Sequence, residues 1–287
     1  MDSSGQQFRQ ALEIELPLQV VGVINAYGAR LAERAGFRAL YLSGAGVANA
    51  AFGLPDLGMT SLSEVVEEAR RITATTDLPL LVDCDTGWGS PLTIARTVRE
   101  MTRAGVAAIH LEDQVDSKRC GHRPGKQLVS TDVMVDRLKA AVDARTDAGL
   151  VIVARTDAAA GEGLDAALER ASRYVDAGAD VIFAEALTEP EHFRRFAAAI
   201  TVPVLANMTE FGRSPLLSLD QLRELGIRVV LYPLTAFRAM SAAAIKVYAT
   251  LRTEGTQQSL LPDLQTRGEL YDVLDYYAYE ARLERDE

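Results

Sequence analysis

The sequence predicts a single (β/α)8 barrel of the TIM type with an additional C-terminal helical segment, and two observations support this fold class. Eight apolar, strand-like runs alternate with eight segments of helical spacing, which is the repeating unit of such barrels. Glycines follow several helical segments directly before the next strand, and a linker rich in Pro or Ser is lacking. An open, doubly wound sheet is the main alternative, because strand number alone does not establish closure.

The strands are predicted from continuous apolar runs, which are typical of parallel strands that are covered on both faces. In chain order the runs are Gln19–Ile24, Ala39–Ser43, Leu80–Asp85, Ala107–Glu112, Val151–Thr156, Val181–Ala186, Val202–Asn207 and Arg228–Pro233. Because the active site of such a barrel forms at the carboxyl ends of its strands, the residues that end these runs are the first candidates for a site.

The helices are predicted from apolar residues that return every three or four positions. They are Tyr27–Ala35, Ser61–Thr75, Ser90–Ala104, Thr131–Thr146, Leu164–Ala177, Pro190–Ala199, Ser218–Leu225 and Ala236–Leu251. Four of them are followed by a glycine that suits a helix C-cap, namely Gly36, Gly105, Gly178 and Gly226.

An additional segment follows the eighth predicted helix. We expect one domain, 1–287, in which residues 254–287 form a C-terminal helical extension, with Thr256–Pro262 as a loop and Thr266–Arg285 as a helix. The helix carries the tyrosines Tyr271, Tyr276, Tyr277 and Tyr279. Since aromatic residues are frequent in subunit interfaces, it is a candidate for packing on a neighbouring subunit. Packing back on its own barrel is the alternative.

Composition and charge limit the classes of function. With 48% hydrophobic and 24% charged residues, the chain is an ordinary soluble globular protein. A formal net charge of -10 argues against nucleic acid or an anionic membrane surface as partner, although a local cationic site could still bind an anionic substrate. A membrane-spanning run and a signal-peptide pattern are lacking, so we expect a cytoplasmic protein. Two cysteines, Cys84 and Cys120, are too few for a disulfide framework.

Two carboxylates close the third predicted strand. Asp83 and Asp85 point to the same face, whereas Cys84 points to the other face, where we expect it to pack. Two like charges so close need compensation, and a divalent cation with oxygen ligands is the simplest source of it. The glycines of the following turn, 86–89, would let the backbone approach a ligand closely. The alternative is that one Asp caps a helix and the other binds a loop.

Five or six successive strands end in polar residues. These are Tyr41 and Ser43, Asp83 and Asp85, His110, Glu112 and Asp113, Arg155 and Asp157, Glu185, and Asn207 and Thr209. Polar strand ends are common for capping, but so many in succession favour a site at one rim of the barrel. The acidic residues suit a metal, whereas Arg155, Asn207 and Thr209 suit substrate carboxylates. Together they predict a metal-assisted reaction on a polycarboxylate.

The loop after the fourth strand, Gln114–Ser130, is long and basic; we call it the lid. Its thiol, Cys120, is surrounded by Lys118, Arg119, His122, Arg123 and Lys126. Cationic surroundings make a thiol reactive. Gly121 and Gly125 could let the loop move, so we expect it to bring the thiol to bound substrate and to exclude water. The alternative is a basic surface loop with an incidental thiol.

Two weaker signals do not change this interpretation. The segment 44–46, Gly-Ala-Gly, lacks the third glycine of a dinucleotide-binding loop, because Asn49 stands in its place. His110 lies inside a predicted strand and His192 lies on a predicted helix, so we expect both to be structural.

Two motifs resemble the isocitrate lyase and phosphoenolpyruvate mutase superfamily. They are Asp83-x-Asp85-x-Gly87-Trp88-Gly89 and Lys118-Arg119-Cys120-Gly121-His122, the second of which marks the lyase branch. Within that branch the chain is similar to the methylisocitrate lyases at 53–56, 121–124, 207–212, 232–238, 255–256 and 265–267. The resemblance covers nearly the whole chain.

The resemblance implies a Mg²⁺-dependent carbon–carbon lyase, with Mn²⁺ as the other possible ion. Such an enzyme cleaves a tricarboxylate, 2-methylisocitrate, to pyruvate and succinate in the methylcitrate cycle of propionate breakdown. The implied metal ligands are Asp83 and Asp85, with Asp56 near the metal through water. Cys120 is implied as the general acid, and Tyr41 as the position of the base.

The resemblance also implies a set of substrate-binding positions and an assembly. The positions are Ser43, Gly44, Ala45, Gly121, His122, Arg155, Glu185, Asn207, Thr209, Arg238 and Arg267. Arg267 would bring the C-terminal segment to the catalytic face. The implied assembly is a homotetramer in which neighbouring subunits exchange the C-terminal helix.

Some positions depart from the family pattern. Ala45 replaces the second glycine of a usual Ser-Gly-Gly, Gly125 replaces a common Asn, and Ala184 replaces a common Pro. Each change could move substrate preference without altering the chemistry. Phe183, in place of the bulkier indole of isocitrate lyases, leaves space for a substrate methyl group.

Three other functions remain open from the sequence. One is a lyase acting on a related 2-hydroxy diacid, such as 2,3-dimethylmalate or isocitrate. Another is a phosphonate or oxaloacetate enzyme of the superfamily, which is disfavoured because those branches lack the Lys-Arg-Cys-Gly-His loop. The last is a non-catalytic protein that binds a metal or a carboxylate, which would not need Cys120.

Overall fold

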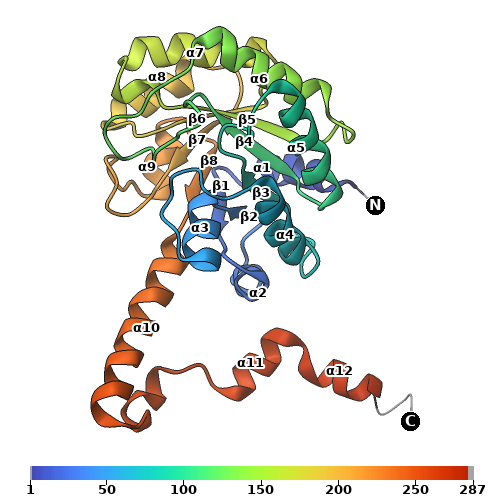
Figure 1. Ribbon diagram of the computed structural model, residues 1–287, viewed down its shortest axis with the longest axis vertical. Helices are drawn as coiled ribbons and strands as arrows, with labels where there is room; N and C mark the ends of the chain where they lie inside the picture. Colours follow the sequence, from blue (N-terminus) through green and yellow to red (C-terminus); the bar gives the residue numbers. More distant parts are fainter. Residues whose placement is uncertain (1, 284–287) are drawn as a thin grey trace.

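Eight parallel strands form one closed barrel in the computed structural model, which describes residues 2–283 (Figure 1). Each strand pairs with the next along the chain, and β8 pairs with β1. The strands are β1 (Leu18–Gly22), β2 (Ala39–Leu42), β3 (Leu80–Asp83), β4 (Ala108–Glu112), β5 (Val151–Thr156), β6 (Val181–Ala184), β7 (Val204–Asn207) and β8 (Val229–Tyr232). The (β/α)8 prediction is confirmed, and the open sheet is excluded.

The strands are slightly shorter than the apolar runs that predicted them. β7, for example, begins at Val204 and not at Val202. The residue before β7 is Pro203, which has no N–H to donate to a neighbouring strand, although its carbonyl still accepts from the Ile182 N–H at 3.0 Å. The proline therefore limits where regular pairing of this strand can begin.

At least one helix follows each strand, and the helices between strands surround the barrel (Figure 1). The helices are α1 (Ser4–Ile14), α2 (Ala26–Arg34), α3 (Gly44–Phe52), α4 (Leu62–Thr73), α5 (Pro91–Arg103), α6 (Thr131–Asp143), α7 (Leu164–Asp176), α8 (Pro190–Ala199), α9 (Leu219–Glu224), α10 (Thr235–Glu254), α11 (Arg267–Leu274) and α12 (Tyr276–Leu283), with 3-10 turns η1 (Ala158–Ala160) and η2 (Gln258–Asp263). Ser61 and Ser218 begin α4 and α9 with capping boxes, which satisfy the free N–H groups of the first turn.

Two helices were not predicted from the sequence. α1 packs Phe8 and Ala11 into the apolar cluster inside the barrel, together with Leu18 and Val20 of β1, so it closes the amino end of the barrel. α3 follows β2 directly, and its Gly- and Ala-rich sequence hides the spacing by which helices are recognised. α3 belongs to the carboxyl end, where the candidate site lies.

Cys84 packs as predicted. It is fully buried in the apolar layer between the barrel and its outer helices, away from the Asp83 side chain inside the barrel. Burial raises the pKa of the Cys84 thiol well above its usual value. This cysteine is therefore an inert packing residue.

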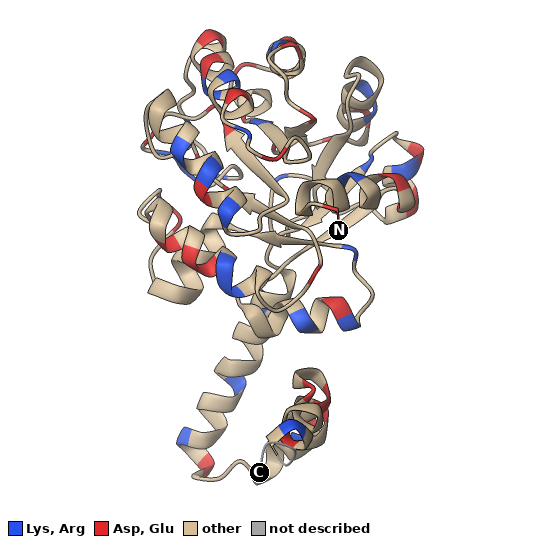
Figure 2. Ribbon diagram, turned by 90° about the vertical axis from the view of Figure 1, so that its right-hand side faces the viewer, with Lys and Arg blue, Asp and Glu red and all other residues tan. Residues whose placement is uncertain are grey.

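The eighth predicted helix forms, as α10, but most of its length does not cover its own barrel. α10 leaves the barrel, and α11 and α12 continue beyond it, in both views (Figures 1 and 2). All twenty residues of α10, Thr235–Glu254, lie in the described part of the chain, and none of them is buried. Met240, Ile245 and Tyr248 are among its exposed apolar side chains.

The C-terminal segment differs from the prediction in detail. The helix expected at Thr266–Arg285 is two helices, α11 and α12, because Asp275 between them has a left-handed backbone with φ of 54°. The end expected at Arg285 lies outside the described residues. The expected loop Thr256–Pro262 overlaps η2. The segment touches α2, where the Tyr27 hydroxyl donates to Gln265 Oε1 at 2.9 Å.

Candidate active site

A cavity of about 100 Å³ lies at the carboxyl end of the barrel, under the lid. Most of the predicted site residues line it, namely Tyr41, Ser43, Ala45, Asp56, Asp83, Cys120, Gly121, His122, Arg155, Glu185, Asn207, Thr209 and Arg238. Pockets for small ligands usually have roughly 300–1,000 Å³. The space is smaller than that, and the lid is closed over it, since Lys126 of the lid contacts Asp157 beyond β5. Entry of a ligand therefore requires the lid to move.

Three predicted residues do not line this cavity. Gly44 lies behind Asp83, to which its N–H donates at 3.1 Å. Asp85 lies beside Asp83 and faces Lys118. Arg267 is exposed at the start of α11 and is not among the cavity residues of the described chain. The expectation that Arg267 brings the C-terminal segment to the catalytic face is therefore not met within one chain.

The acidic pair at the end of β3 is buried and lies beside a cation. The Asp85 N–H donates to Asp83 Oδ1 at 3.1 Å, and Lys118 Nζ lies 2.6 Å from Asp85 Oδ1. Lys118 also pairs with Asp56. Lys118 comes from the lid, so the closed lid places a positive charge on the acidic pair.

The two carboxyl groups differ in their affinity for protons. Burial would raise the pKa of Asp83, but nearby positive charges and the Asp85 N–H hold it at about 2. Burial raises the pKa of Asp85, and the charge of Asp83 raises it further, to about 7. Burial would lower the pKa of Lys118, but the carboxylates around it, Asp85 above all, raise it instead. Lys118 therefore stays a cation.

The turn after the pair needs its glycine. Gly87 has φ of 91°, and a Cβ there would lie 2.5 Å from Ile94 Cγ1. Asp85 itself has a left-handed backbone with φ of 46°, which Asp tolerates better than most residues. This sharp turn holds Asp85 beside Asp83.

The chemistry of this end of the cavity fits a hard divalent cation. In the described residues there is no cluster of three or more His, Cys, Asp or Glu side chains arranged to hold a metal. Mg²⁺ does not need one, because it usually binds one or two carboxylates and completes its shell with water and substrate oxygens. Asp83 and Asp85 face a common point, since a Cβ on Gly44 would lie 3.1 Å from Asp83 Oδ2 and 3.4 Å from Asp85 Oδ1.

Tyr41 and His110 form a second polar group beneath the cavity. The Tyr41 hydroxyl lies 3.0 Å from His110 Nε2 and 3.4 Å from Asp83 Oδ2. Burial, aided by the charge of Asp83, raises the pKa of Tyr41 well above its usual value, and burial lowers the pKa of His110. Both are therefore neutral at rest. The sequence interpretation treated His110 as structural, although it shares the face of β4 with Glu112.

Glu185 lies among the predicted substrate-binding residues that line the opposite side of the cavity. It lies 3.4 Å from Arg155 Nη1 and 3.0 Å from His122 Nε2, and it accepts from Asn207 Nδ2 at 3.3 Å. Burial would raise the pKa of Glu185, but Arg155 and His122 hold it well below its usual value. The group is therefore ionised and positions the donors around it.

The imidazole of His122 has a fixed tautomer. Its Nδ1 accepts from the Arg213 backbone N–H at 2.9 Å, so the proton must be on Nε2, which faces Glu185. The sequence did not predict a role for Arg213. Its contact is made by the backbone N–H, which every residue except proline has, so the residue type does not reveal it. The contact ties the lid to the loop after β7.

The base of the lid is held by its own residues. Gln114 pairs with Leu128 in an isolated antiparallel bridge. The Gln114 side chain also donates to the Arg119 carbonyl at 2.9 Å and accepts from the Arg119 N–H at 3.0 Å. Cys120, the next residue, is thereby presented to the cavity that it lines.

A family model described as phosphoenolpyruvate phosphomutase matches residues 8–252. The chain belongs to this family. A 2-methylisocitrate lyase of Shewanella oneidensis is 58% identical to it over 283 residues, which cover 99% of this chain and 97% of that protein. This member of the phosphoenolpyruvate phosphomutase family is an enzyme, a carbon–carbon lyase.

Solved structures of the family share the fold. A 2,3-dimethylmalate lyase is 37% identical with a TM-score of 0.90, covering 97% of this chain and 94% of that one. A phosphonopyruvate hydrolase, whose structure is a complex with oxalate and Mg²⁺, is 28% identical with a TM-score of 0.86, covering 98% of each chain. In the described residues of this lyase, none of the helices is long and apolar enough to cross a membrane.

Proposed function

We propose that this lyase cleaves 2-methylisocitrate to pyruvate and succinate with the aid of Mg²⁺, in the breakdown of propionate by the methylcitrate cycle. The observation that carries the proposal is the placement of Cys120, Asp83 and Arg155 around one small, closed cavity. A thiol, an acidic pair and a guanidinium are the groups that such a cleavage requires. The 58% identity to a 2-methylisocitrate lyase supports the choice of substrate.

Asp83 and Asp85 are the proposed metal ligands, with Asp56 close to the ion through water. Mg²⁺ is the favoured ion and Mn²⁺ the alternative, because both prefer carboxylate oxygen. The bound ion would stabilise negative charge on the substrate hydroxyl oxygen and its neighbouring carboxylate. Lys118 would have to share or leave its contact with Asp85 when the ion is bound.

The substrate carboxylates are assigned to the cationic and amide side chains across the cavity. Arg155 offers a planar fork that suits a carboxylate, and Asn207 and Thr209 add neutral donors. Arg238 lines the same cavity and stacks on Phe211, with its guanidinium carbon 5.7 Å from the ring centroid. The remaining proposed substrate-binding positions are Ser43, Gly44, Ala45, Gly121, His122 and Glu185.

The proposed chemistry moves one proton away from the substrate and one onto it. The bond between the hydroxyl-bearing carbon and its neighbour breaks, the hydroxyl oxygen becomes the ketone of pyruvate, and the bonding electron pair remains on the succinate half. Tyr41 accepts the hydroxyl proton as its own proton passes to His110 Nε2, 3.0 Å away. Cys120 then donates a proton to the succinate carbon.

The proposed protonation by Cys120 also requires that water be excluded from the cavity. The carbanion-like succinate half would be quenched unselectively if bulk water reached it. The closed lid leaves a cavity of only about 100 Å³. Protonation by Cys120 is therefore the expected route.

A related 2-hydroxy diacid is the alternative substrate. The solved 2,3-dimethylmalate lyase is 37% identical, so a change in the pocket could redirect the same chemistry. Ala45 and Phe183 line the cavity and are the residues that would sense an additional methyl or carboxylate group. Isocitrate is the other alternative.

A homotetramer is the proposed assembly, and residues 254–287 are proposed to pack on a neighbouring subunit. The exposed apolar side chains of α10 support this, because a long helix with an uncovered apolar stripe needs a partner surface. In such an assembly Arg267 could reach a neighbour's cavity. Sedimentation of the purified chain should give a mass near that of four 31.1 kDa subunits. We also propose a cytoplasmic location.

The test is pyruvate release from purified protein with Mg²⁺. 2-Methylisocitrate, isocitrate and 2,3-dimethylmalate are offered separately, with and without EDTA. We expect 2-methylisocitrate to have the highest kcat/KM by at least about 100-fold, since one methyl or carboxylate group changes discrimination on that scale, and EDTA to abolish turnover. A preference for 2,3-dimethylmalate would overturn the substrate, and full activity in EDTA would overturn the metal.

A further inference from the structure

The side chain of a lysine near the end of the lid is almost fully buried, which is unusual for this residue type. The Lys126 side chain is only 6% exposed. Its Nζ donates to the Gly121 carbonyl at 2.6 Å and to Asp157 Oδ1 at 2.7 Å. One ammonium group therefore closes the turn that follows Cys120 and fixes that turn to the end of β5.

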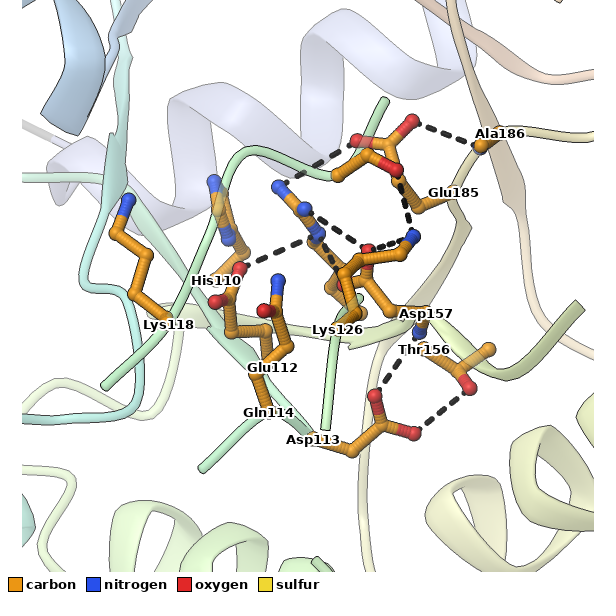
Figure 3. A network of polar contacts seen from close by, with 12 residues as sticks. His110, Glu112, Asp113, Gln114, Lys118, Lys126, Thr156, Asp157, Glu185 and Ala186 are labelled. Atoms are coloured by element: carbon orange, nitrogen blue, oxygen red, sulfur yellow. Dashed lines mark hydrogen bonds and ion pairs between the residues drawn. The ribbon is translucent and has the colours of Figure 1, made fainter. Parts of the chain in front are cut away.

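Asp157 also holds a substrate-facing residue. Its Oδ2 accepts from Arg155 Nε at 2.9 Å, and its Oδ1 accepts from Arg155 Nη2 at 3.2 Å. Asp157 is 1% exposed and is not among the cavity residues of the described chain, so substrate would not touch it. Figure 3 shows Lys126 and Asp157 facing one another beside Glu185. A single buried carboxylate thus pairs with the lid and with Arg155.

Asp157 is itself fixed from below. Its N–H donates to Asp113 Oδ1 at 2.9 Å, and Asp113 Oδ2 accepts from the Thr156 hydroxyl at 2.7 Å (Figure 3). Tyr174 donates to the same oxygen at 2.9 Å. Because these contacts belong to the barrel and not to the lid, Asp157 stays in place whether or not Lys126 reaches it.

The lid turn lies directly on Arg155. A Cβ on Gly121 would lie 2.4 Å from Arg155 Nη2 and 2.5 Å from Glu185 Cγ. The height of the Cys120–Gly121 backbone above the cavity is therefore set by this contact, and Lys126 holds the Gly121 carbonyl in that position.

We propose that Lys126 and Asp157 are positioning residues, which together form a lid latch. The latch keeps the lid closed over the cavity, so that Cys120 faces substrate while Asp157 orients Arg155. When the lid opens, the Lys126 contact breaks and the Arg155 contact remains. The consequence for turnover rests on the proposed function, whereas the latch itself is a property of the chain without substrate.

The first experiment measures how fast iodoacetamide alkylates each cysteine in the full-length protein without substrate or metal, using mass spectrometry of the two cysteine peptides. Lys126→Met should speed alkylation of Cys120 about tenfold, since a buried hydrogen bond to a charged group shifts an equilibrium on that scale. Cys84 is fully buried and should stay at the wild-type rate, so it reports unfolding.

Two further variants sharpen this measurement. Arg123→Met removes a positive charge from an exposed position on the same loop and should leave the Cys120 rate within about twofold of wild type, as expected for a surface change. Lys126→Arg keeps the charge and the donor groups, so it should restore most of the protection.

A double-mutant cycle tests whether the two residues act as one unit. Asp157→Asn should speed alkylation of Cys120, and the Lys126→Met, Asp157→Asn double variant should be no faster than the quicker single variant, because both remove the same contact. With 2-methylisocitrate, Asp157→Asn should also raise KM, since Arg155 loses its partner, whereas Lys126→Met should mainly lower kcat.

The outcomes separate the two proposals. A wild-type Cys120 rate in Lys126→Met, or equal acceleration at Cys84, would overturn the latch. Additive effects in the double variant would overturn the shared contact. Failure to cleave 2-methylisocitrate would overturn the proposed function alone, because the alkylation rates are measured without it.

Discussion

The two ends of the barrel interior are built from the same strands but from opposite kinds of side chain. At the amino end, apolar residues such as Leu18 of β1 and Val153 of β5 pack with Phe8 of α1 in one buried cluster. At the carboxyl end many interior side chains are charged and still buried, as Arg155 and Glu185 are. On β5 the change occurs within two residues, between Val153 and Arg155.

Along each strand, the apolar end therefore contributes mainly to stability, and the polar end holds the residues that could do chemistry. Burial of apolar surface stabilises the fold by about 25 cal/mol per Å². Burial of charges costs stability unless they are paired, and the carboxyl end shows that cost, because burial raises the pKa of Glu112 well above its usual value. The apolar end therefore supports a polar end that is built for function.

The largest expected effect is on the chemistry of the polar end. Cys120→Ser should lower kcat by about 1,000-fold, within the range for loss of a general acid, while the unfolding midpoint stays within about 1 °C. Kinetics of pyruvate release and thermal unfolding measure the two effects. Cys84→Ser is the matched control, because it should keep kcat and lower stability instead. More than a tenth of wild-type kcat in Cys120→Ser would contradict the assigned role.

The next effect is on the stability of the apolar end. Leu18→Ala should lower the free energy of unfolding by about 3 kcal/mol, because it leaves a cavity in a closely packed cluster. Its kcat at low temperature should be unchanged. Urea unfolding measures the loss, with Leu92→Ala as the control, since Leu92 is 84% exposed. A loss of kcat in folded Leu18→Ala would show that the two ends are coupled.

A smaller effect is expected in the pH dependence of stability. Glu185 has a lowered pKa in the folded chain, so the stability that it contributes is present above its unfolded value of 4.5 and is lost as the pH falls below it. Between pH 6 and pH 3, Glu185→Gln should therefore lose about 2 kcal/mol less than wild type. Urea unfolding at both pH values is the measurement. Identical pH profiles would mean that Glu185 is not held by its cations, and exposed Glu191→Gln is the control.

The strand residues of the site could be predicted from the sequence because a strand has a fixed period. Asp83, Arg155 and Asn207 each end an apolar run, and parallel strands of a barrel bring such ends to one rim. The closed barrel followed from the alternation of strands and helices. These features depend on local patterns that repeat along the chain.

Other features depend on contacts between distant segments and could not be predicted in this way. The apolar spacing of α10 indicates a helix with one apolar face. It does not indicate whether that face packs on its own barrel or on another surface. Lys118 reaches Asp85 only because the lid follows a particular course. Asp275 breaks the C-terminal helix without the glycine or proline that usually signals a break.

The smallest expected effect concerns a residue that lies at the carboxyl end of the barrel but outside the cavity. It tests whether such a residue affects catalysis. Ser218 begins α9 on that side of the barrel, outside the cavity residues of the described chain, and its hydroxyl accepts from the Gln221 N–H at 3.3 Å. Ser218→Ala should lower stability by about 1 kcal/mol through loss of the cap. Its kcat should not change, because the helix start is fixed from outside the site. Urea unfolding and pyruvate release together measure this, and Ser218→Asp, which can still accept the N–H, should restore stability. A fall in kcat would show that chemistry at this end depends on the framework of helix starts as well as on the side chains inside the barrel.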